Sequence, residues 1–358
     1  MDTNLEILAD TVRSAVADRR ALRIRGGGTK DFYGQTLTGD LLDTRSYTGI
    51  VDYDPTELVI TARCGTPLKT IDAALAAQGQ MLAFEPPHFG EGATLGGCIA
   101  AGLSGPRRQA AGALRDFVLG ATLMNHRGEV LRFGGRVMKN VAGYDVSRLL
   151  AGSLGTLGLI VDVSLKVLPK PAVDLTLSST VDEATALRKL NEWSGKPLPI
   201  SASAWRGGVL KLRLSGTGSA VETAAARLSN ELSWTRVDAE AAARFWIGIR
   251  EHTDSFFGGA TALWRLSIPS TAPALGLGDE QLIEWGGALR WLRTGIDATT
   301  VRAAIERTGG HATLFRGVDK SAGVFHPLPN ALRKIHIALK TEFDGAGVFN
   351  RDRMYGDF

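Results

Sequence analysis

Residues 25–30 read RGGGTK and directly follow a short segment, residues 21–25, that predicts a strand. Consecutive glycines let backbone N–H groups converge on an anion, and Thr29 and Lys30 add a hydroxyl and a positive charge. A diphosphate suits such a loop, and a plain glycine turn between two strands is the alternative. The chain holds neither a GxGxxG fingerprint nor a GxxxxGK[ST] loop, which disfavours NAD bound in the usual way and a Walker-type site.

Two further glycine-rich segments follow in the same half of the chain. Residues 93–97 read ATLGG, and residues 152–158 read GSLGTLG. Each indicates a close approach of the backbone that requires glycine. Three such segments in order predict one long ligand lying along the first half of the chain.

The second half predicts a different architecture. Pro169 and Pro171 mark a boundary, and residues 173–237 then read strand, helix, strand, strand, helix, strand. Residues 262–315 repeat that order, with a turn-rich stretch where the first helix of the repeat would be. This order is typical of the ferredoxin-like split βαβ unit.

Composition excludes several classes of function. The 358 residues carry a net charge of +4, and the basic residues are scattered, whereas a nucleic-acid-binding surface requires a basic cluster. The two cysteines, Cys64 and Cys98, are spaced unlike a metal or redox motif, which favours reduced thiols and a cytoplasmic setting. The N-terminus does not resemble a signal peptide, and no apolar stretch reaches the ~18 residues of a membrane span.

The ordered motifs resemble a known family. RGGGTK, PPHFGEGATLGG (residues 86–97), KNVAGYDVSRL (residues 139–149) and GSLGTLGLIVDVSLKVLP (residues 152–169) resemble the FAD-binding domain of the vanillyl-alcohol-oxidase superfamily, also called PCMH-type. Within it the chain is most similar to the FAD-binding E subunits of bacterial glycolate oxidases, a likeness that extends to the tail GVFNRDRMY (residues 347–355). The resemblance implies an α+β fold with a two-lobed FAD-binding domain at residues 1–171. A ferredoxin-like cap would follow at residues 172–358 and end in a segment that faces the flavin.

The resemblance also implies which residues contact FAD. The diphosphate would lie on the first glycine loop, the second segment would continue that contact near the flavin, and the adenosine would lie against the backbone of the third. The implied contacts are Arg25, Gly26, Gly27, Gly28, Thr29, Lys30, Thr94, Gly96, Gly97, Ser104, Gly105, Asn140, Gly143, Tyr144, Gly158, Ile160 and Asn350, with Arg353 and Met354 in the same terminal segment as Asn350.

The chain departs from its relatives in two informative ways. Many relatives link a histidine after the glycine run covalently to the flavin, whereas Thr29 and Lys30 stand in that region here, so we expect non-covalent FAD. Related subunits that oxidise 2-hydroxy acids carry H-x-x-D-G-N-x-H and E-H-G segments, and both are missing. We identify no catalytic base. The candidates are His88, whose alternative role is to fix a turn, and Lys139, which could stabilise reduced flavin or be an ordinary surface lysine.

These observations predict an FAD-binding subunit of glycolate oxidase that takes part in oxidising glycolate to glyoxylate and passes electrons to an acceptor other than NAD. The implied partners are a second FAD-containing subunit and an iron–sulfur subunit, because two cysteines cannot hold a cluster. Any contact with the plasma membrane would run through those partners. The alternatives are a self-sufficient FAD-dependent 2-hydroxy-acid dehydrogenase of the D-lactate type and a non-catalytic scaffold subunit.

Overall fold

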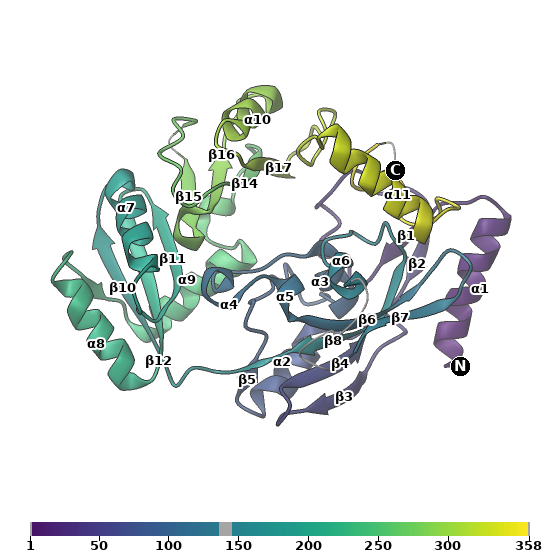
Figure 1. Cartoon of the computed structure of the whole chain (residues 1–358), viewed down its shortest axis with the longest axis horizontal. Coiled ribbons are helices and arrows are strands. Elements are labelled where there is room, and N and C mark those ends of the chain that lie inside the picture. The colour runs from purple at the N-terminus through teal and green to yellow at the C-terminus, as the bar shows by residue number, and fades with distance from the viewer. Residues whose placement is uncertain (1, 136–144, 279, 357–358) are drawn as a thin grey trace. The chain divides into compact units, whose positions relative to one another are not determined.

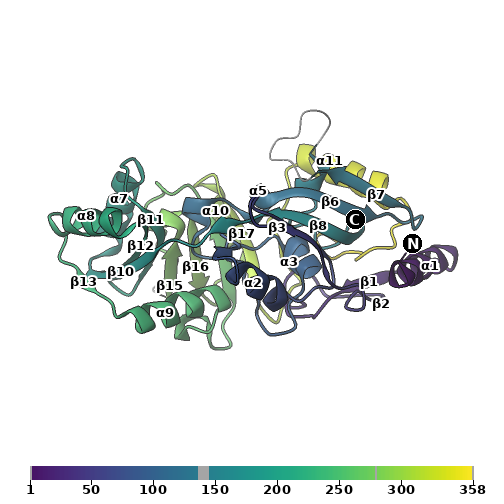
Figure 2. The same cartoon turned by 90° about the horizontal axis from the view of Figure 1, so that it is seen from below.

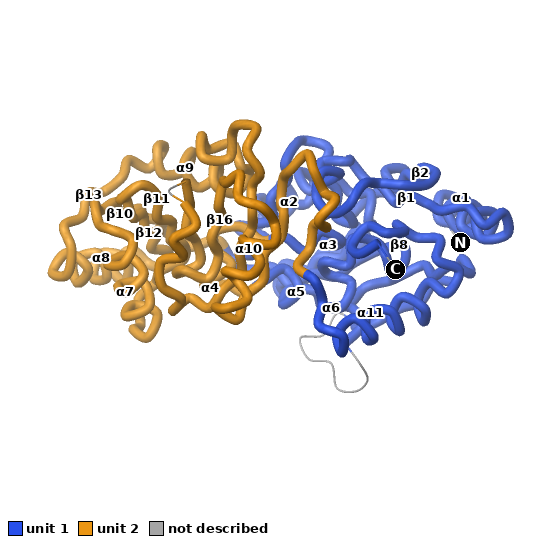
Figure 3. The backbone as a smooth tube through the Cα atoms, turned by 90° about the horizontal axis from the view of Figure 1, so that it is seen from above, with its two compact units in different colours: residues 1–103, 113–169, 327–358 blue, residues 104–112, 170–326 orange. Residues whose placement is uncertain are grey.

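The computed structural model describes residues 2–135, 145–278 and 280–356, and these form two compact units (Figure 3). Unit 1 comprises residues 1–103, 113–169 and 327–358, and unit 2 comprises residues 104–112 and 170–326. The two units therefore divide the chain differently from the predicted boundary at residue 171. The C-terminal segment belongs to unit 1, and a short piece of the glycine-rich region belongs to unit 2.

Unit 1 combines two small sheets with a larger one and the helices that flank them (Figure 1). Its elements are α1 (Thr3–Ala17), β1 (Leu22–Arg25), β2 (Asp40–Asp43), β3 (Ile50–Asp54), β4 (Val59–Arg63), α2 (Leu68–Ala76), β5 (Gln80–Met81), α3 (Leu95–Ala101), α5 (Leu114–Phe117), β6 (Val118–Met124), β7 (Val130–Gly134), α6 (Val146–Leu149), β8 (Leu159–Lys166), β9 (Leu168–Pro169) and α11 (Asn330–Phe343).

Strand β1 runs parallel to β2 and ends where the first glycine loop begins. Helix α1 packs beside this pair because its apolar side chains recur at helical spacing, and Leu8 and Val12 are buried in one core with Leu22. Phe349 forms an isolated parallel bridge with Leu22, so the C-terminal segment adds to the open edge of the same small sheet.

The larger sheet of unit 1 has the strand order β3-β4-β8-β6-β7, and its strands are antiparallel. Apolar residues alternate with Asp162, Ser164 and Lys166 in β8, which is the central strand of this sheet. It is more deeply buried than a half-exposed strand, because Val161, Val163 and Ser164 are all covered.

Unit 2 contains a single sheet of eight strands in the order β13-β10-β12-β11-β15-β16-β14-β17. Its elements are α4 (Arg108–Ala111), β10 (Val173–Thr180), α7 (Glu183–Ser194), β11 (Ile200–Arg206), β12 (Val209–Gly216), α8 (Gly218–Ser229), β13 (Thr235–Arg236), α9 (Ala239–Glu251), η1 (Ser255–Phe257), β14 (Leu263–Ser267), β15 (Gln281–Glu284), η2 (Trp285–Gly287), β16 (Leu289–Arg293), α10 (Ala298–Glu306) and β17 (His311–Arg316).

The helices of unit 2 lie on both faces of this sheet (Figure 2). Helices α7 and α8 cover the face that carries Leu210, Leu212 and Leu214. Helix α9 covers the opposite face, where Trp246 packs against Ala202 and Ala204. Among the described residues, the segment between β14 and β15 forms no helix, as its turn-rich sequence predicts.

Candidate cofactor-binding site

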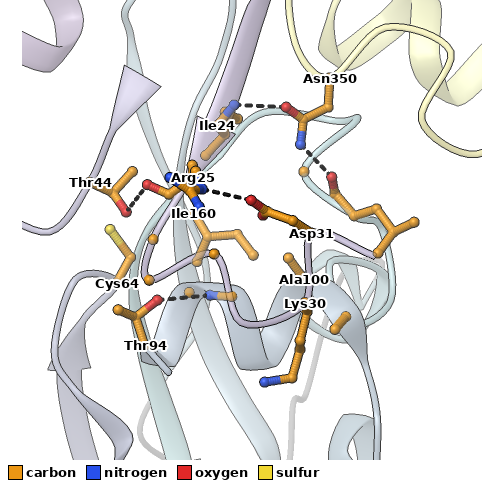
Figure 4. Close-up of a pocket in the computed structure, with 18 of the residues that line it drawn as sticks. Ile24, Arg25, Lys30, Asp31, Thr44, Cys64, Thr94, Ala100, Ile160 and Asn350 are labelled. Carbon is orange, nitrogen blue, oxygen red and sulfur yellow. Dashed lines mark hydrogen bonds and ion pairs between the residues drawn. The ribbon is translucent and has the colours of Figure 1, made fainter. Parts of the chain in front are cut away.

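A pocket in unit 1 collects residues from all three glycine-rich segments (Figure 4). Strand β1, the loop after it, α3, β8 and the C-terminal segment each contribute to its wall. The lining residues are Ile24, Arg25, Gly26, Gly27, Gly28, Thr29, Lys30, Asp31, Leu37, Thr44, Cys64, Thr94, Gly96, Gly97, Ala100, Ala101, Leu154, Gly155, Gly158, Leu159, Ile160, Asn350 and Arg353.

The first glycine loop leaves no room for side chains, because atoms of neighbouring residues lie against it. A Cβ atom on Gly27 would lie 1.6 Å from the carbonyl oxygen of Gly92, and one on Gly26 would lie 2.1 Å from Oγ1 of Thr94. Gly28 has φ +72°, the left-handed conformation that glycine adopts without steric cost. Within the described part of the chain, the backbone amides of residues 26–29 donate no hydrogen bond. Four consecutive donors therefore remain for an anionic group in the pocket.

Helix α3 begins beside this loop. The Thr94 side chain caps the helix by accepting a hydrogen bond from the Gly97 amide, at 3.4 Å. Gly96 has no room for a side chain, since its Cβ would lie 2.8 Å from Cβ of Cys64. Gly97 does have room, because the nearest atom to a Cβ there would be Oγ1 of Thr94 at 3.4 Å. The backbone of Gly97 is thus exposed to the pocket with no side chain in between.

Two cationic side chains that line the pocket are held in place by neighbouring groups. Arg25 Nε donates to Oδ2 of Asp31 across the glycine loop, at 2.7 Å. The Lys30 ammonium donates to the backbone carbonyl of His88 at 3.2 Å and lies 5.5 Å from the ring centroid of Phe89. These contacts fix two cationic side chains on either side of the four amide donors.

Strand β8 supplies another wall of the pocket through its first residues. Gly158 has φ +152°, and a Cβ there would lie 2.7 Å from the carbonyl oxygen of Met124. Ile160 is 4% exposed and pairs with Leu123 in the sheet. This wall presents backbone and apolar surface, as a planar organic group requires.

The C-terminal segment closes the pocket through Asn350. Its Oδ1 accepts a hydrogen bond from the Ile24 amide at 2.7 Å, and its Nδ2 donates to the Leu154 carbonyl at 2.6 Å (Figure 4). Arg353 is 5% exposed, and burial lowers the pKa of its guanidinium to about 10. Its guanidinium donates to the carbonyl oxygens of Asp31, Tyr33 and Gln35. Residues far apart in the sequence thus share one wall.

Both cysteines are free and fully buried, and Cys64 lines the pocket. Burial raises the pKa of the Cys64 and Cys98 thiols to about 12, so both stay protonated near neutral pH. A protonated thiol is a poor nucleophile, which disfavours a covalent bond from either cysteine to a cofactor.

Not every predicted contact belongs to this pocket. Ser104 and Gly105 belong to unit 2, where the Gly105 carbonyl accepts a hydrogen bond from Trp285 Nε1 at 3.1 Å. Met354 lines a separate hollow beside α11. Lys139, Asn140, Gly143 and Tyr144 lie outside the described residues.

The catalytic candidate His88 does not line the pocket. Its Nε2 lies 3.2 Å from Oδ2 of Asp72, a residue of α2. Sequence reasoning missed Asp31, Thr44, Leu154 and Gly155, which do line it. Leu154 and Gly155 stand within the quoted GSLGTLG motif, so these two had a usable signal in the sequence, whereas Asp31 and Thr44 had none.

Comparison with known proteins identifies the family. Residues 3–134 match a family described as an FAD binding domain. The chain is 47% identical over 352 residues to the glycolate oxidase subunit GlcE of Escherichia coli, and the alignment covers 98% of this chain and 97% of that protein. This chain belongs to the GlcE family. FAD, the cofactor predicted from the sequence, is confirmed by the family and its domain.

More distant relatives of this GlcE-family chain share less than half of its length or only its fold. The glycolate oxidase subunit GlcD of Bacillus subtilis is 33% identical over 165 residues, which cover 45% of this chain and 35% of that protein. The crystal structure of p-cresol methylhydroxylase with substrate bound superposes with a TM-score of 0.72 at 14% identity, covering 99% of this chain and 88% of the other. The PCMH-type FAD-binding fold with mixed α/β content, predicted from the sequence, is therefore confirmed.

Two kinds of feature are missing from the described residues. No described helix combines the length and the apolar character that crossing a bilayer requires. Among the same residues, no group of three or more histidine, cysteine or acidic side chains is arranged to hold a metal ion.

Proposed function

We propose that this chain is the FAD-carrying E-type subunit of a glycolate oxidase, which oxidises glycolate to glyoxylate and passes the electrons to an acceptor other than NAD. The observation that carries the proposal is the 47% identity with Escherichia coli GlcE over nearly the full length of both chains. A multi-subunit oxidase follows from that relative's name, which calls it a subunit.

The pocket of unit 1 is the proposed FAD site. The cofactor's diphosphate would lie against the four amide donors of residues 26–29, with Lys30 and Arg25 supplying positive charge beside it. Gly97 would let the cofactor approach the backbone of α3 closely, and Gly158 and Ile160 would border the adenosine. The residues present fit the group, because the donors suit phosphate oxygens and the apolar wall suits the rings.

Bound FAD would supply the electron-accepting chemistry. This chain's own residues would bind and orient it: the glycine loop holds the anion, Thr94 fixes the start of α3, and Asn350 joins β1 to the segment before β8. The FAD would be non-covalent, because Thr29 and Lys30 offer no linking atom of the usual kind and both thiols are protonated.

The partners we propose are a second FAD-containing subunit and an iron–sulfur subunit. This chain has no assigned base for the hydroxyl proton of glycolate, so a partner would supply it, and His88 and Lys139 stay the candidates within this chain. We place the protein in the cytoplasm, with any contact to the inner face of the plasma membrane made through the partners.

The cap assignment also stays a proposal. The elements of residues 173–236 follow the order strand, helix, strand, strand, helix, strand, and they pair as β13-β10-β12-β11. Strands β15-β16-β14-β17 pair in the corresponding order, and the described residues between β14 and β15 form no helix. This supports a ferredoxin-like cap made of two joined halves, with the FAD-binding domain at residues 1–171 rejoined by the C-terminal segment.

Substitution of Gly97 tests the FAD site without crowding the fold. A side chain there has space, and an acidic residue in the first turn of a helix is favourable, so Gly97→Asp should fold. Its charge would repel the diphosphate, whereas the nearly isosteric Gly97→Asn would not. We expect Gly97→Asp to bind FAD about tenfold more weakly than Gly97→Asn, a difference of about 1.4 kcal/mol. Equal affinities measured by flavin fluorescence titration would contradict the diphosphate assignment.

A visible spectrum of the purified chain, followed by anaerobic addition of glycolate, tests the function. We expect a flavin spectrum that stays oxidised until the partner subunits are added. Bleaching by glycolate alone would favour the self-sufficient dehydrogenase. Absence of flavin even after incubation with FAD would favour the scaffold subunit.

A further inference from the structure

Helix α11 carries a buried cation that faces the end of the chain. The Lys340 side chain is 9% exposed, and its ammonium donates to the carbonyl oxygens of Thr156 and Phe349, at 2.7 and 2.8 Å, and to Oδ2 of Asp344 at 2.7 Å. All three N–H donors of the ammonium are therefore used. The Thr156 carbonyl belongs to the third glycine-rich segment, so this one side chain ties that segment to the C-terminus.

Asp344, at the end of α11, orders the residues that follow. Its Oδ1 accepts a hydrogen bond from the Val348 amide at 3.0 Å, and its Oδ2 accepts one from the Phe349 amide at 2.8 Å. The carboxylate side chain is 0% exposed and has the Lys340 ammonium as its counter-charge. Burial lowers the pKa of Lys340, and the charge of Asp344 and its hydrogen bond oppose that shift.

Residues 344–353, which we call the C-terminal strap, then run along the wall of the FAD pocket. The Leu22 amide donates to the Val348 carbonyl at 2.7 Å, and the Asn350 amide donates to the Leu22 carbonyl at 2.9 Å. Asn350 next spans Ile24 and Leu154, and Arg353 binds the carbonyl of Asp31 at 2.9 Å. The strap thus contacts the chain on both sides of the glycine loop of residues 26–30.

We propose that Lys340 is a positioning residue for FAD: by fixing the C-terminal strap at its start, it holds the strap's Asn350 and Arg353 where they set the width of the FAD pocket. The proposal rests on the proposed FAD site. Lys340 itself would not touch the cofactor. Because coupling between two sites is reciprocal, FAD should in turn hold the strap closed.

The matched control is Arg302 in unit 2. It is a buried cation on a helix, 8% exposed, and its guanidinium donates to the carbonyl oxygens of Ala322 and Gly323, both at 2.6 Å. It therefore anchors a following segment much as Lys340 does, but it lies in the other compact unit and outside the pocket's lining. Loss of either cation should lower the unfolding temperature.

The experiment compares Lys340→Met with Arg302→Met in the full chain. We expect Lys340→Met to raise the dissociation constant of FAD at least tenfold and to change the visible circular dichroism of the remaining bound flavin. We expect Arg302→Met to leave both unchanged within about twofold at a similar loss of thermal stability. Equal FAD affinities of the two variants would overturn the proposal.

Hydrogen exchange on the unaltered chain provides a second measurement that does not depend on how either variant folds. We expect FAD to slow exchange of the Val348, Phe349 and Asn350 amides while leaving residues 322–325 unchanged. Flavin that binds without slowing those three amides would overturn the proposal and leave the FAD site intact. Failure of the unaltered chain to bind FAD would instead overturn the proposed function.

Discussion

The imidazole of His88 contacts a residue outside the pocket, which favours a structural role over a catalytic one. The ring's Nε2 faces the carboxylate of Asp72, and Lys30 reaches the backbone carbonyl of His88, not its ring. We therefore expect His88→Ala to keep bound FAD and to keep glycolate-dependent dye reduction by the assembled oxidase within about threefold. A general base contributes about 10² to 10⁴ in rate, so a loss of that size with flavin and assembly intact would make His88 the base.

At the scale of single residues, the sequence predicted those pocket residues that belong to a recognisable local motif. RGGGTK, Thr94, Gly97 and Ile160 all line it, although their contacts with FAD stay predictions. Asp31 and Thr44 were missed because their positions depend on contacts with neighbouring residues. Asp31 accepts a hydrogen bond from the Arg25 side chain, and Thr44 Oγ1 donates one to the Arg25 carbonyl. The sequence alone does not indicate these two contacts, because they form only once the strands are aligned in the folded chain.

At the scale of elements, one carboxylate joins two helices of unit 2. Glu231, just beyond α8, accepts hydrogen bonds from Lys189 and Trp193 of α7, both at 3.0 Å, and from Lys196 at 3.3 Å. The hydrogen bond from Lys189 contributes most to lowering the pKa of Glu231 from 4.5 to about 2. The folded state therefore prefers the ionised form more strongly than the unfolded state does.

This preference makes the stability of unit 2 depend on pH. Stabilisation by Glu231 is fully present above pH 4.5 and is lost as the pH falls toward about 2, where the folded state also takes up the proton. We expect Glu231→Gln to lower the free energy of unfolding by about 2 kcal/mol at pH 7. Urea titrations followed by tryptophan fluorescence would show the difference between the two proteins shrinking between pH 4.5 and 2. A difference that stays constant down to pH 2 would contradict this assignment.

Two helices, α3 and α9, were not predicted from the sequence pattern. Helix α3 lies within a glycine-rich segment in which the sequence predicts no helix, and it forms because Thr94 caps it and its own Cys98 and Ile99 are buried. Helix α9 follows the first βαββαβ set, and it is stabilised by tertiary burial, since Trp246 donates to Thr176 Oγ1 at 2.9 Å. A high glycine content argues against a helix when only the sequence is considered. In the folded chain, burial of an apolar face can still stabilise the helix.

At the scale of the whole molecule, the chain returns to its first unit at the end. Pro169 and Pro171 mark a boundary that is visible in the sequence. The return of residues 327–358 to unit 1 is not visible there, because it depends on burial of Val348 and Phe349 in the core formed with α1 and β1. The resemblance to a flavin-facing tail was the only sequence signal for it. Which unit a distant segment joins is decided by the burial of its side chains, and local secondary-structure propensity does not indicate it.

That return leaves α11 with an apolar surface exposed to solvent. Leu332 and Ile335 lie one turn apart on the same face and are 47% and 54% exposed, and Lys340 is the helix's one buried residue. Exposed apolar side chains gathered on one helix are typical of a surface that another protein covers. In a subunit of a larger oxidase, a partner subunit is the expected cover.

We therefore expect the double variant Leu332→Glu, Ile335→Glu to keep its fold and its FAD but to lose the partner subunits. Burying a leucine or isoleucine contributes about 1.5 kcal/mol or more, so two lost side chains predict an affinity about a hundredfold lower. The control is Ile247→Glu, which replaces an isoleucine that is 50% exposed on α9 of the other unit. Co-purification of the tagged chain with its partners measures the effect. If the double variant retains its partners as well as the control does, the apolar surface of α11 is not the subunit interface.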